Sequence, residues 1–360
     1  MHRALRKVSA AAIALTGIIA LMAPAQSENN TDDYTFGGLI TPRGSEKTAP
    51  NEFKKNGPYK IALVGAGVGN SWIVQTFEEG KVEAARHKDI ASYVQTDAEW
   101  QPAKQVADLE DVLTKNVDAV ILSAVTPTNA NAEMEKFAAR KIPIVILGTG
   151  ATGNYAVEVR GGAEPFGRVG GDFLVKQLHG KGTVWAFRGI AGAQEEVERY
   201  NGFASALKGT DIKIGAEVYG DWNYAKSKQL CENLVLSGKP VDGIWFSGAE
   251  MTRACVDVFQ QAHKPLVPMT GEGNNGFFRI WKTTGMTSVA AIFPPSLTPS
   301  AVRVALALLK GKSVPRHLWS EPPALTNADF TKYYRPDLND NYWVPSSLPE
   351  ARIKELYGKK

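Results

Sequence analysis

The sequence has few of the residues that bind metals and no excess of either charge. Its 360 residues include only two cysteines and five histidines, none at metal-site spacing, so we expect no structural zinc and no cofactor. Lysine and arginine number 41 against 37 acidic residues. Residues 1–25 hold three of the basic and none of the acidic residues, which leaves 38 against 37 in the remainder. Because no positive field remains to attract a phosphate backbone, the composition predicts no nucleic-acid partner.

The sequence also lacks an apolar run long enough to cross a bilayer, which takes about 20 residues. The run Ala10–Met22 follows a basic start and precedes the Ala23–Ala25 triplet, a small-x-small pattern typical of a signal peptidase site. A transmembrane anchor would need a longer run, and no cysteine follows that could carry a lipoprotein anchor. We therefore predict that residues 1–25 are a secretory signal peptide, removed on export of a soluble protein.

Export bears on the two cysteines, Cys231 and Cys255, which lie on two successive predicted helices. In an oxidising compartment they can form a disulfide. Two buried free thiols are an equal alternative, because the sequence does not give the distance between their Cα atoms.

Apolar runs and amphipathic segments alternate from Tyr59 onward. Residues 26–57 are polar and contain several glycines and prolines, so we expect a flexible or loosely docked leader, with order beginning at Tyr59. Short apolar runs then predict strands, and the segments between them have apolar residues at helical spacing. The predicted strands are 60–64, 90–95, 119–122 and 143–147, with helices 72–86, 102–115 and 129–140. This order predicts a doubly wound parallel sheet.

The same alternation starts again in the second half of the chain. It predicts helices 166–178, 194–207, 226–236 and 250–262, strands 182–187, 212–219, 243–246 and 266–270, and finally a strand 288–293 and a helix 299–310. The fold class is therefore α/β, with two doubly wound lobes joined by a hinge of several crossings near 160–163, 292–295 and 320–323. The expected division is an N-terminal lobe of 58–161 and 292–320, a C-terminal lobe of 162–291 and 321–346, and a tail of 347–360.

Open parallel sheets bind ligands at the carboxyl ends of their strands, and several polar and aromatic residues follow the predicted strands. Aromatic rings such as Trp72 and Trp222 can cover the apolar face of a sugar. Arg199 offers a fork of donors and Glu272 offers acceptors. Each has a plainer interpretation: core packing for the indoles, an ion pair with Glu195 for Arg199, and a turn or helix cap for Glu272. The candidate ligand-binding residues are Asn70, Ser71, Trp72, Thr149, Arg199, Trp222, Glu250, Glu272 and Asn274.

Two catalytic or cofactor interpretations receive less support from the sequence. The stretch Gly65-Ala-Gly-Val-Gly-Asn70 partly matches a dinucleotide-binding loop, but Asn70 replaces the third glycine and an exported protein meets little dinucleotide. Glu195, Glu196 and Glu272 could supply a carboxylate pair for glycoside cleavage, yet no Gly-x-Ser-x-Gly elbow or Ser/His/Asp set is evident. We therefore expect a binding protein and not an enzyme.

Several stretches resemble the type I periplasmic binding proteins, the ribose- and galactose-binding class that serves ABC transporters. They include KIALVGAGVGNSW, NVDAVILSAVTPTN, RGIAGAQEEVERYNGF and PLVPMTGEGNNG, in the order expected for that family. The resemblance implies a periplasmic, monomeric receptor that closes on a sugar or related polyol and delivers it to an ABC permease in the inner membrane. Delivery to a chemoreceptor or sensor kinase is the alternative.

The resemblance also implies roles for particular residues. Asn70 and Trp72 would contact the ligand from the first lobe, Arg199 would be the central arginine, Trp222 the aromatic wall, and Glu272 would replace a family aspartate. The sequence departs from the family where Gly148-Thr149 replaces an Asp-Arg pair, Gly248-Ala249 replaces a polar residue, and Ile292 replaces a polar hinge residue. Fewer hydroxyl partners predict a ligand that is larger, less hydroxylated or modified.

Overall fold

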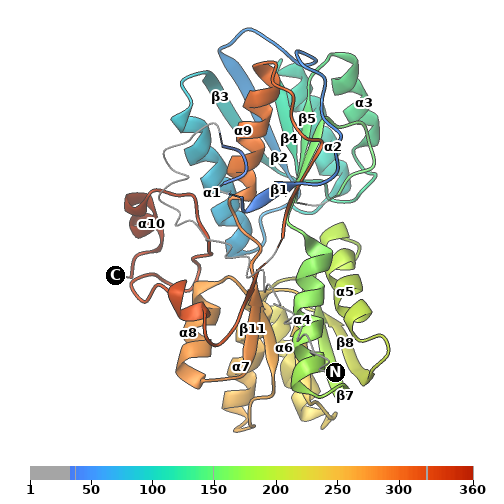
Figure 1. The fold of residues 1–360 in the computed structure, drawn as a ribbon, viewed down its shortest axis with the longest axis vertical. Helices are drawn as coiled ribbons and strands as arrows, with labels where there is room; N and C mark the ends of the chain where they lie inside the picture. Colours follow the sequence, from blue (N-terminus) through green and yellow to red (C-terminus); the bar gives the residue numbers. More distant parts are fainter. Residues whose placement is uncertain (1–32, 37, 149, 322, 360) are drawn as a thin grey trace, which may run out of the picture.

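The computed structural model describes residues 33–36, 38–148, 150–321 and 323–359 and has two lobes, one above the other in Figure 1. Each lobe contains a mostly parallel β-sheet covered by helices, which confirms the predicted fold class. No helix within these ranges is long and apolar enough to span a bilayer. The predicted signal peptide, residues 1–25, lies outside the described residues.

The N-terminal lobe is built on a seven-stranded sheet in the order β1-β12-β6-β5-β4-β2-β3, in which only β1 runs antiparallel to its neighbour. Its strands are β1 (Ile40–Pro42), β2 (Tyr59–Gly65), β3 (Ile90–Asp97), β4 (Ala119–Leu122), β5 (Ile144–Gly148), β6 (Val157–Arg160) and β12 (His317–Ser320). Its helices are α1 (Ser71–Arg86), α2 (Pro102–Thr114), α3 (Asn131–Ala139) and α9 (Leu297–Leu309).

The C-terminal lobe is built on a six-stranded sheet in the order β13-β11-β10-β9-β7-β8, in which only β13 is antiparallel. Its strands are β7 (Lys181–Arg188), β8 (Asp211–Tyr219), β9 (Gly243–Phe246), β10 (Met269–Glu272), β11 (Ser288–Ala291) and β13 (Ala324–Leu325). Its helices are α4 (Ala163–Gln177), α5 (Gln194–Ala206), α6 (Tyr224–Leu236), α7 (Ala249–Gln261) and α8 (Asn275–Thr284); η2 (Phe330–Lys332) and α10 (Glu350–Tyr357) follow.

The central strands of the N-terminal lobe are buried on both faces. No residue of the runs Ile61–Val64, Ala119–Leu122 and Ile144–Leu147 is more than 3% exposed. Continuous apolar runs of this kind are typical of parallel strands that have helices on both sides. Because β2, β4 and β5 pair in parallel register, their carboxyl ends lie together at the edge that faces the other lobe.

The described chain passes between the lobes after β6, after β11 and after β12. β6 belongs to the first sheet and α4 to the second lobe, β11 to the second sheet and α9 to the first lobe, and β12 and β13 again to different sheets. Because the chain crosses between the lobes several times at one junction, the relative motion of the lobes is restricted to a hinge.

The C-terminal segment, residues 340–348, contacts both lobes. Trp343 exchanges two hydrogen bonds with Gln75 of α1, at 2.9 and 3.0 Å, and Val344 N donates to Gly273 O in the other lobe at 2.9 Å. The carboxylate of Glu79 accepts hydrogen bonds from Ser346 and Ser347. Figure 1 shows α10 beside the junction of the lobes, so this part of the chain is a further link between them.

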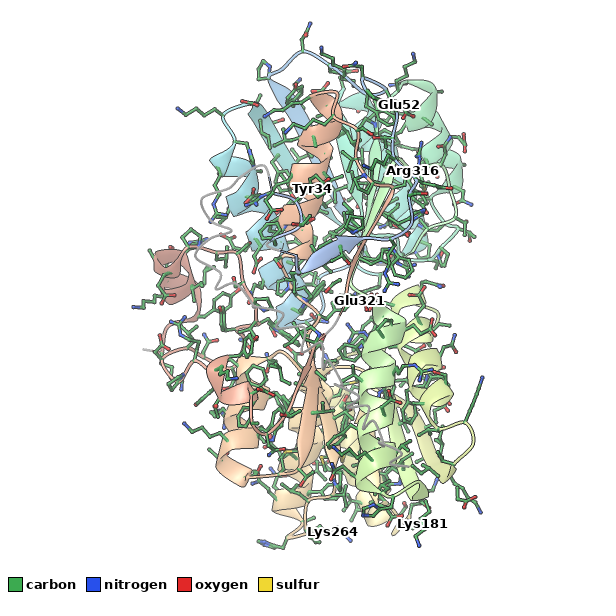
Figure 2. The ribbon with its side chains drawn as sticks, viewed as in Figure 1. Tyr34, Glu52, Lys181, Lys264, Arg316 and Glu321 are labelled. Atoms are coloured by element: carbon green, nitrogen blue, oxygen red, sulfur yellow. A yellow bond between two sulfur atoms is a disulfide. The ribbon has the colours of Figure 1, made fainter. Side chains whose placement is uncertain are left out.

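The described part of the predicted leader is docked, so the expectation that order begins at Tyr59 is wrong. Ile40 is fully buried in β1, which pairs with β12, and Thr48 N donates to Val314 O. Figure 2 shows Tyr34 beside α9, and Tyr34 O accepts a hydrogen bond from Ser300. The sequence did not predict that this segment is docked, because only a few of its residues are buried and most of the rest are polar.

Cys231 of α6 and Cys255 of α7 form a disulfide. Their Cα atoms are 5.5 Å apart, which is within the range that a disulfide requires. The two helices pack side by side, so the bond joins neighbouring elements of the C-terminal lobe.

Candidate functional site

A cavity of about 100 Å³ lies between the lobes, at the carboxyl ends of strands from both sheets. We call it the interlobe cavity. A buried water needs roughly 10–15 Å³ of such space, so a ligand in the cavity would replace roughly seven to ten waters. The space therefore suits one small molecule. Six of the predicted ligand-binding residues line it: Asn70, Trp72, Arg199, Trp222, Glu250 and Glu272.

Two other predicted contacts do not line the cavity. The side chain of Asn274 caps α8, where it accepts a hydrogen bond from Phe277 N, and its amide donates to Asp340 O. Ser71 accepts a hydrogen bond from Trp343 Nε1 and donates to Glu250. Both residues therefore hold elements of the site in place instead of facing a ligand. Thr149 lies outside the described residues.

Arg199 lies at the centre of the site, on α5, and is 4% exposed. Its Nε donates to Glu195 Oε1 at 2.9 Å, Nη1 to Ser247 O at 2.6 Å, and Nη2 to Glu272 Oε1 at 3.3 Å. Its guanidinium carbon lies 3.8 Å from the centre of the Phe166 ring. The ion pair with Glu195, the plainer interpretation, is therefore present, and the same guanidinium also bonds to the carboxylate of Glu272, which lines the cavity.

The two carboxylates beside Arg199 are buried. Burial raises the pKa of Glu272 to about 7, although Arg199 acts in the opposite direction. Burial also raises the pKa of Glu195. The site therefore places two buried carboxylates on one guanidinium.

The raised pKa of Glu272 predicts a pH dependence of stability. A carboxyl whose pKa is higher in the folded than in the unfolded protein stabilises the fold below the unfolded pKa, and this contribution is lost as the pH rises through the folded value. Wild type is therefore expected to lose up to about 3 kcal/mol relative to Glu272→Gln between pH 4.5 and pH 7. Urea unfolding of both proteins across this range measures the difference. Equal pH slopes would contradict it, and Glu232→Gln on the exposed side of α6 should keep the wild-type slope.

Trp100 and Trp222 form an aromatic pair across the lobes, with ring centres 6.4 Å apart. Trp100 was not predicted as a site residue. Each indole follows the second main strand of its lobe, β3 or β8, and each has a positive φ, 60° and 51°. Strained backbone of this kind in residues other than glycine gathers at binding sites. The signal in the sequence was the repeat itself, because a tryptophan stands at the equivalent strand end in both halves.

Glycines make room for both rings. A Cβ on Gly67 would lie 2.5 Å from Trp100, and a Cβ on Gly189 would lie 2.3 Å from Trp222. Gly248, one of the departures from the family pattern, also faces Trp222, at 2.8 Å. The polar residue expected there is absent because the indole occupies its space.

The same packing argues against a dinucleotide at the glycine-rich loop after β2. Trp100 lies against Gly67, and Asp97 Oδ1 accepts the hydrogen bond of Val68 N at 3.0 Å. The loop amide that could hold a phosphate oxygen is thus already bonded to a carboxylate, whose negative charge would repel a phosphate.

Three further aromatic residues that were not predicted, Phe77, Phe293 and Trp343, line the cavity. Phe293 lies at the second crossing, where its carbonyl accepts a hydrogen bond from Trp72 Nε1 at 2.9 Å and its ring lies 5.4 Å from that indole. Trp343 belongs to the C-terminal segment. The part of Phe293 and Trp343 in the site depends on how distant segments meet, which no local pattern reveals.

The lobes contact each other directly around the cavity. The backbone N and the hydroxyl of Ser71, at the start of α1, both donate to Glu250 Oε1, at the start of α7. Arg160 of β6 pairs with Glu198 of α5. With the Trp100–Trp222 contact, these bonds define a closed arrangement.

The fold and the interlobe cavity together define a two-lobed α/β solute-binding protein. A family model described as a periplasmic binding protein domain matches residues 61–313, and the chain belongs to this family. The resemblance seen in the sequence is thereby confirmed.

Individual relatives agree with this assignment. The chain is 27% identical over 258 residues to the ribose import binding protein RbsB of Haemophilus influenzae, covering 71% of this chain and 87% of the relative. It shares the fold of an ABC transporter solute-binding protein from Thermobispora bispora, with a TM-score of 0.74, 20% identity, and coverage of 82% and 94% of the two chains. It also shares the fold of the arabinose-binding component of an ABC transporter from Shewanella sp. ANA-3, with a TM-score of 0.71, 20% identity, and coverage of 76% and 94%.

Proposed function

We propose that the protein is a periplasmic receptor that captures one small polar molecule of the sugar or polyol class by closing its lobes, and delivers it unaltered to an ABC permease. One observation carries the proposal: a cavity of the right size is lined from both lobes, with Arg199 and Glu272 at its centre and indoles around them. A monomer suffices for this mechanism because one chain supplies both walls. The ribose import function of the relative supports the choice of partner.

Contacts between the lobes, such as those of Ser71 with Glu250 and of Trp100 with Trp222, would stabilise the closed arrangement. A ligand that touches both lobes binds this arrangement more tightly than an open one, in which it can contact only one lobe, so it shifts the population toward closure. Glu272, oriented by Arg199, would bind polar groups of the ligand, while Trp72 and Trp222 would cover its apolar face. Exclusion of water strengthens each of these hydrogen bonds.

A thermal-shift screen of residues 26–360 against sugars, polyols, nucleosides and sugar acids tests the proposal. A ligand that binds only the folded protein raises the melting temperature, and small-angle scattering with and without that ligand reports closure. The proposal predicts a hit that also reduces the radius of gyration. It is wrong if no member of these classes binds, or if a hit is chemically converted on incubation.

The tryptophan pair predicts a smaller effect that can be measured with any hit. Trp100→Ala and Trp222→Ala should each weaken binding about fivefold, because each removes an aromatic contact worth about 1 kcal/mol from the closed arrangement. Trp100→Phe and Trp222→Phe should recover most of the affinity. If titration calorimetry gives alanine variants with wild-type affinity, the pair is only structural.

A further inference from the structure

The ionisable side chains that line the interlobe cavity are mostly acidic. Among the described lining residues three are acidic, Glu195, Glu250 and Glu272, and only Arg199 is basic. A neutral sugar would leave this imbalance unchanged. A ligand with a positive group would reduce it, since buried charges require opposite charges nearby.

Arg199 is held by the protein and is poorly placed to serve as a free anion-binding group. Each of its three nitrogens donates to a protein acceptor, on Glu195, Ser247 or Glu272. Its guanidinium also lies over the rings of Phe166 and Phe293, at 3.8 and 4.5 Å. The arginine therefore acts mainly as the counter-charge that keeps two buried carboxylates in place.

Among the described residues, one carboxylate oxygen of a side chain that lines the cavity has no hydrogen-bond partner. Glu195 is 7% exposed and lines the cavity, and its Oε2 is buried with no hydrogen-bond partner among the described residues. Thr76 Oγ1, on a lining residue that is 3% exposed, also has none there. A buried carboxylate oxygen without a donor costs free energy, so the site is suited to a ligand that donates a hydrogen bond to Glu195 and offers a second polar group to Thr76.

The walls around these groups are aromatic. Four indoles line the cavity, those of Trp72, Trp100, Trp222 and Trp343. The faces of indole rings attract cations, and the attraction grows when water is excluded. A hydroxyl could donate a hydrogen bond to Glu195 Oε2. A positively charged donor would in addition be attracted by the acidic side chains and by the faces of the indole rings.

We propose that the interlobe cavity prefers a ligand of sugar size that carries a protonated amine, the amino-sugar class, with the amine bound to Glu195. This inference rests on the proposed function and specifies its ligand. The ring of the ligand would lie against the indoles and its hydroxyls would reach Thr76 and Asn70, whose amide nitrogen is left available when its Oδ1 caps α1.

Titration calorimetry at pH 7 with matched sugars tests the inference. The probes are D-glucosamine and D-galactosamine, the parent sugars D-glucose and D-galactose, and N-acetyl-D-glucosamine, which keeps the ring but has no charge. We expect at least one amine to bind ten times more tightly than its parent sugar and its acetylated form. Glu195→Gln should remove this preference, while Glu232→Gln, a surface change in the same lobe, should leave it intact.

The outcomes separate the two proposals. If neutral sugars bind and close the lobes as well as the amines do, or better, the amine preference is overturned and the receptor function stands. If neither these compounds nor the wider screen gives any binding, both proposals fail. The comparison of amine with acetylated ligand uses the wild-type protein, so it stays decisive even if Glu195→Gln folds poorly.

Discussion

Replacing Arg199 by alanine is expected to lower the stability of the protein by about 3–5 kcal/mol and to reduce ligand affinity at least 100-fold. The variant leaves the carboxylates of Glu195 and Glu272 in the same buried space without the guanidinium that bonds to both of them. Removal of one partner from a buried ion pair costs this much because the remaining charge is uncompensated. Binding falls as well, since Arg199 orients the carboxylates that face the cavity.

Two further variants make the Arg199 result specific. Arg168→Ala, on the exposed part of α4, removes an arginine whose partner Asp172 is solvent-exposed, and it should change stability by less than about 1 kcal/mol. Arg199→Lys keeps the charge but not the three-way fork, so it should recover part of the stability and little of the affinity. Urea unfolding and calorimetry measure both quantities. An Arg199→Ala protein with wild-type stability would show that the three contacts contribute nothing.

The regular part of the fold was predictable because buried parallel strands are apolar throughout. β2, β4 and β9 were located from the runs IALV, AVIL and GIWF, which the structure buries completely. The repeat of this pattern then predicted two lobes. The prediction failed where strands carry polar residues that the fold satisfies, as in β6, whose buried Glu158 accepts hydrogen bonds from Trp319 and bonds to His317.

The end of the second lobe shows the same limit. A strand was predicted over residues 266–270, but β10 is Met269–Glu272, because Leu266 and Val267 are only partly buried and the buried strand positions include the polar Thr270 and Glu272. α8 was missed. Its start, Asn274 and Asn275, has the composition of a loop, yet Asn274 caps the helix and Asn275 N donates to Tyr342 O of the C-terminal segment.

The sequence predicted those site residues whose position depends on a nearby strand or helix, and it did not predict those that distant segments bring to the cavity. Trp222 follows β8, Glu272 ends β10, and Arg199 lies in the second turn of the helix after β7, so their approach to one cavity could be inferred from topology. Trp343 could not, because it reaches the cavity only through contacts of the C-terminal segment with Gln75 and Gly273. Trp100 could have been predicted from the sequence, because its position after a strand in the first half matches that of Trp222 in the second half.

The position of Asn70 and Trp72, which line the cavity from the N-terminal lobe, depends on a buried network at the far end of α1. Asn70 and Trp72 stand at the start of α1, and the other end of that helix is fixed by Glu83. Glu83 is fully buried and is bonded by Arg303 of α9, by Arg86 and by His87. Burial alone would raise the pKa of Glu83, but hydrogen bonds from His87 and Arg303 lower it to about 2. Because the folded pKa is depressed, this contribution to stability is present above pH 4.5 and is lost as the pH falls toward 2.

Arg303→Ala should therefore destabilise the protein by about 3–5 kcal/mol at pH 7, because it leaves Glu83 buried without its main partner. The same change removes the donor to Asp33 O and the cation over the ring of Phe36, so the docked N-terminal segment should also become sensitive to proteases. Lys136→Ala, which breaks ion pairs of an exposed lysine with Glu110 and Glu133, is the control and should cost far less stability than Arg303→Ala.

A double variant separates charge burial from packing in this network. Replacing Arg303 by methionine and Glu83 by leucine removes both charges and keeps the volume, so it should recover most of the stability that Arg303→Ala loses. Ligand affinity is the second readout: if Glu83 and Arg303 position α1, the double variant should restore stability while binding stays weaker than in wild type, since the helix is no longer held by a directional pair. Full recovery of both would show that the pair only fills space. A loss below about 1 kcal/mol for Arg303→Ala in urea unfolding would overturn the role of the pair altogether.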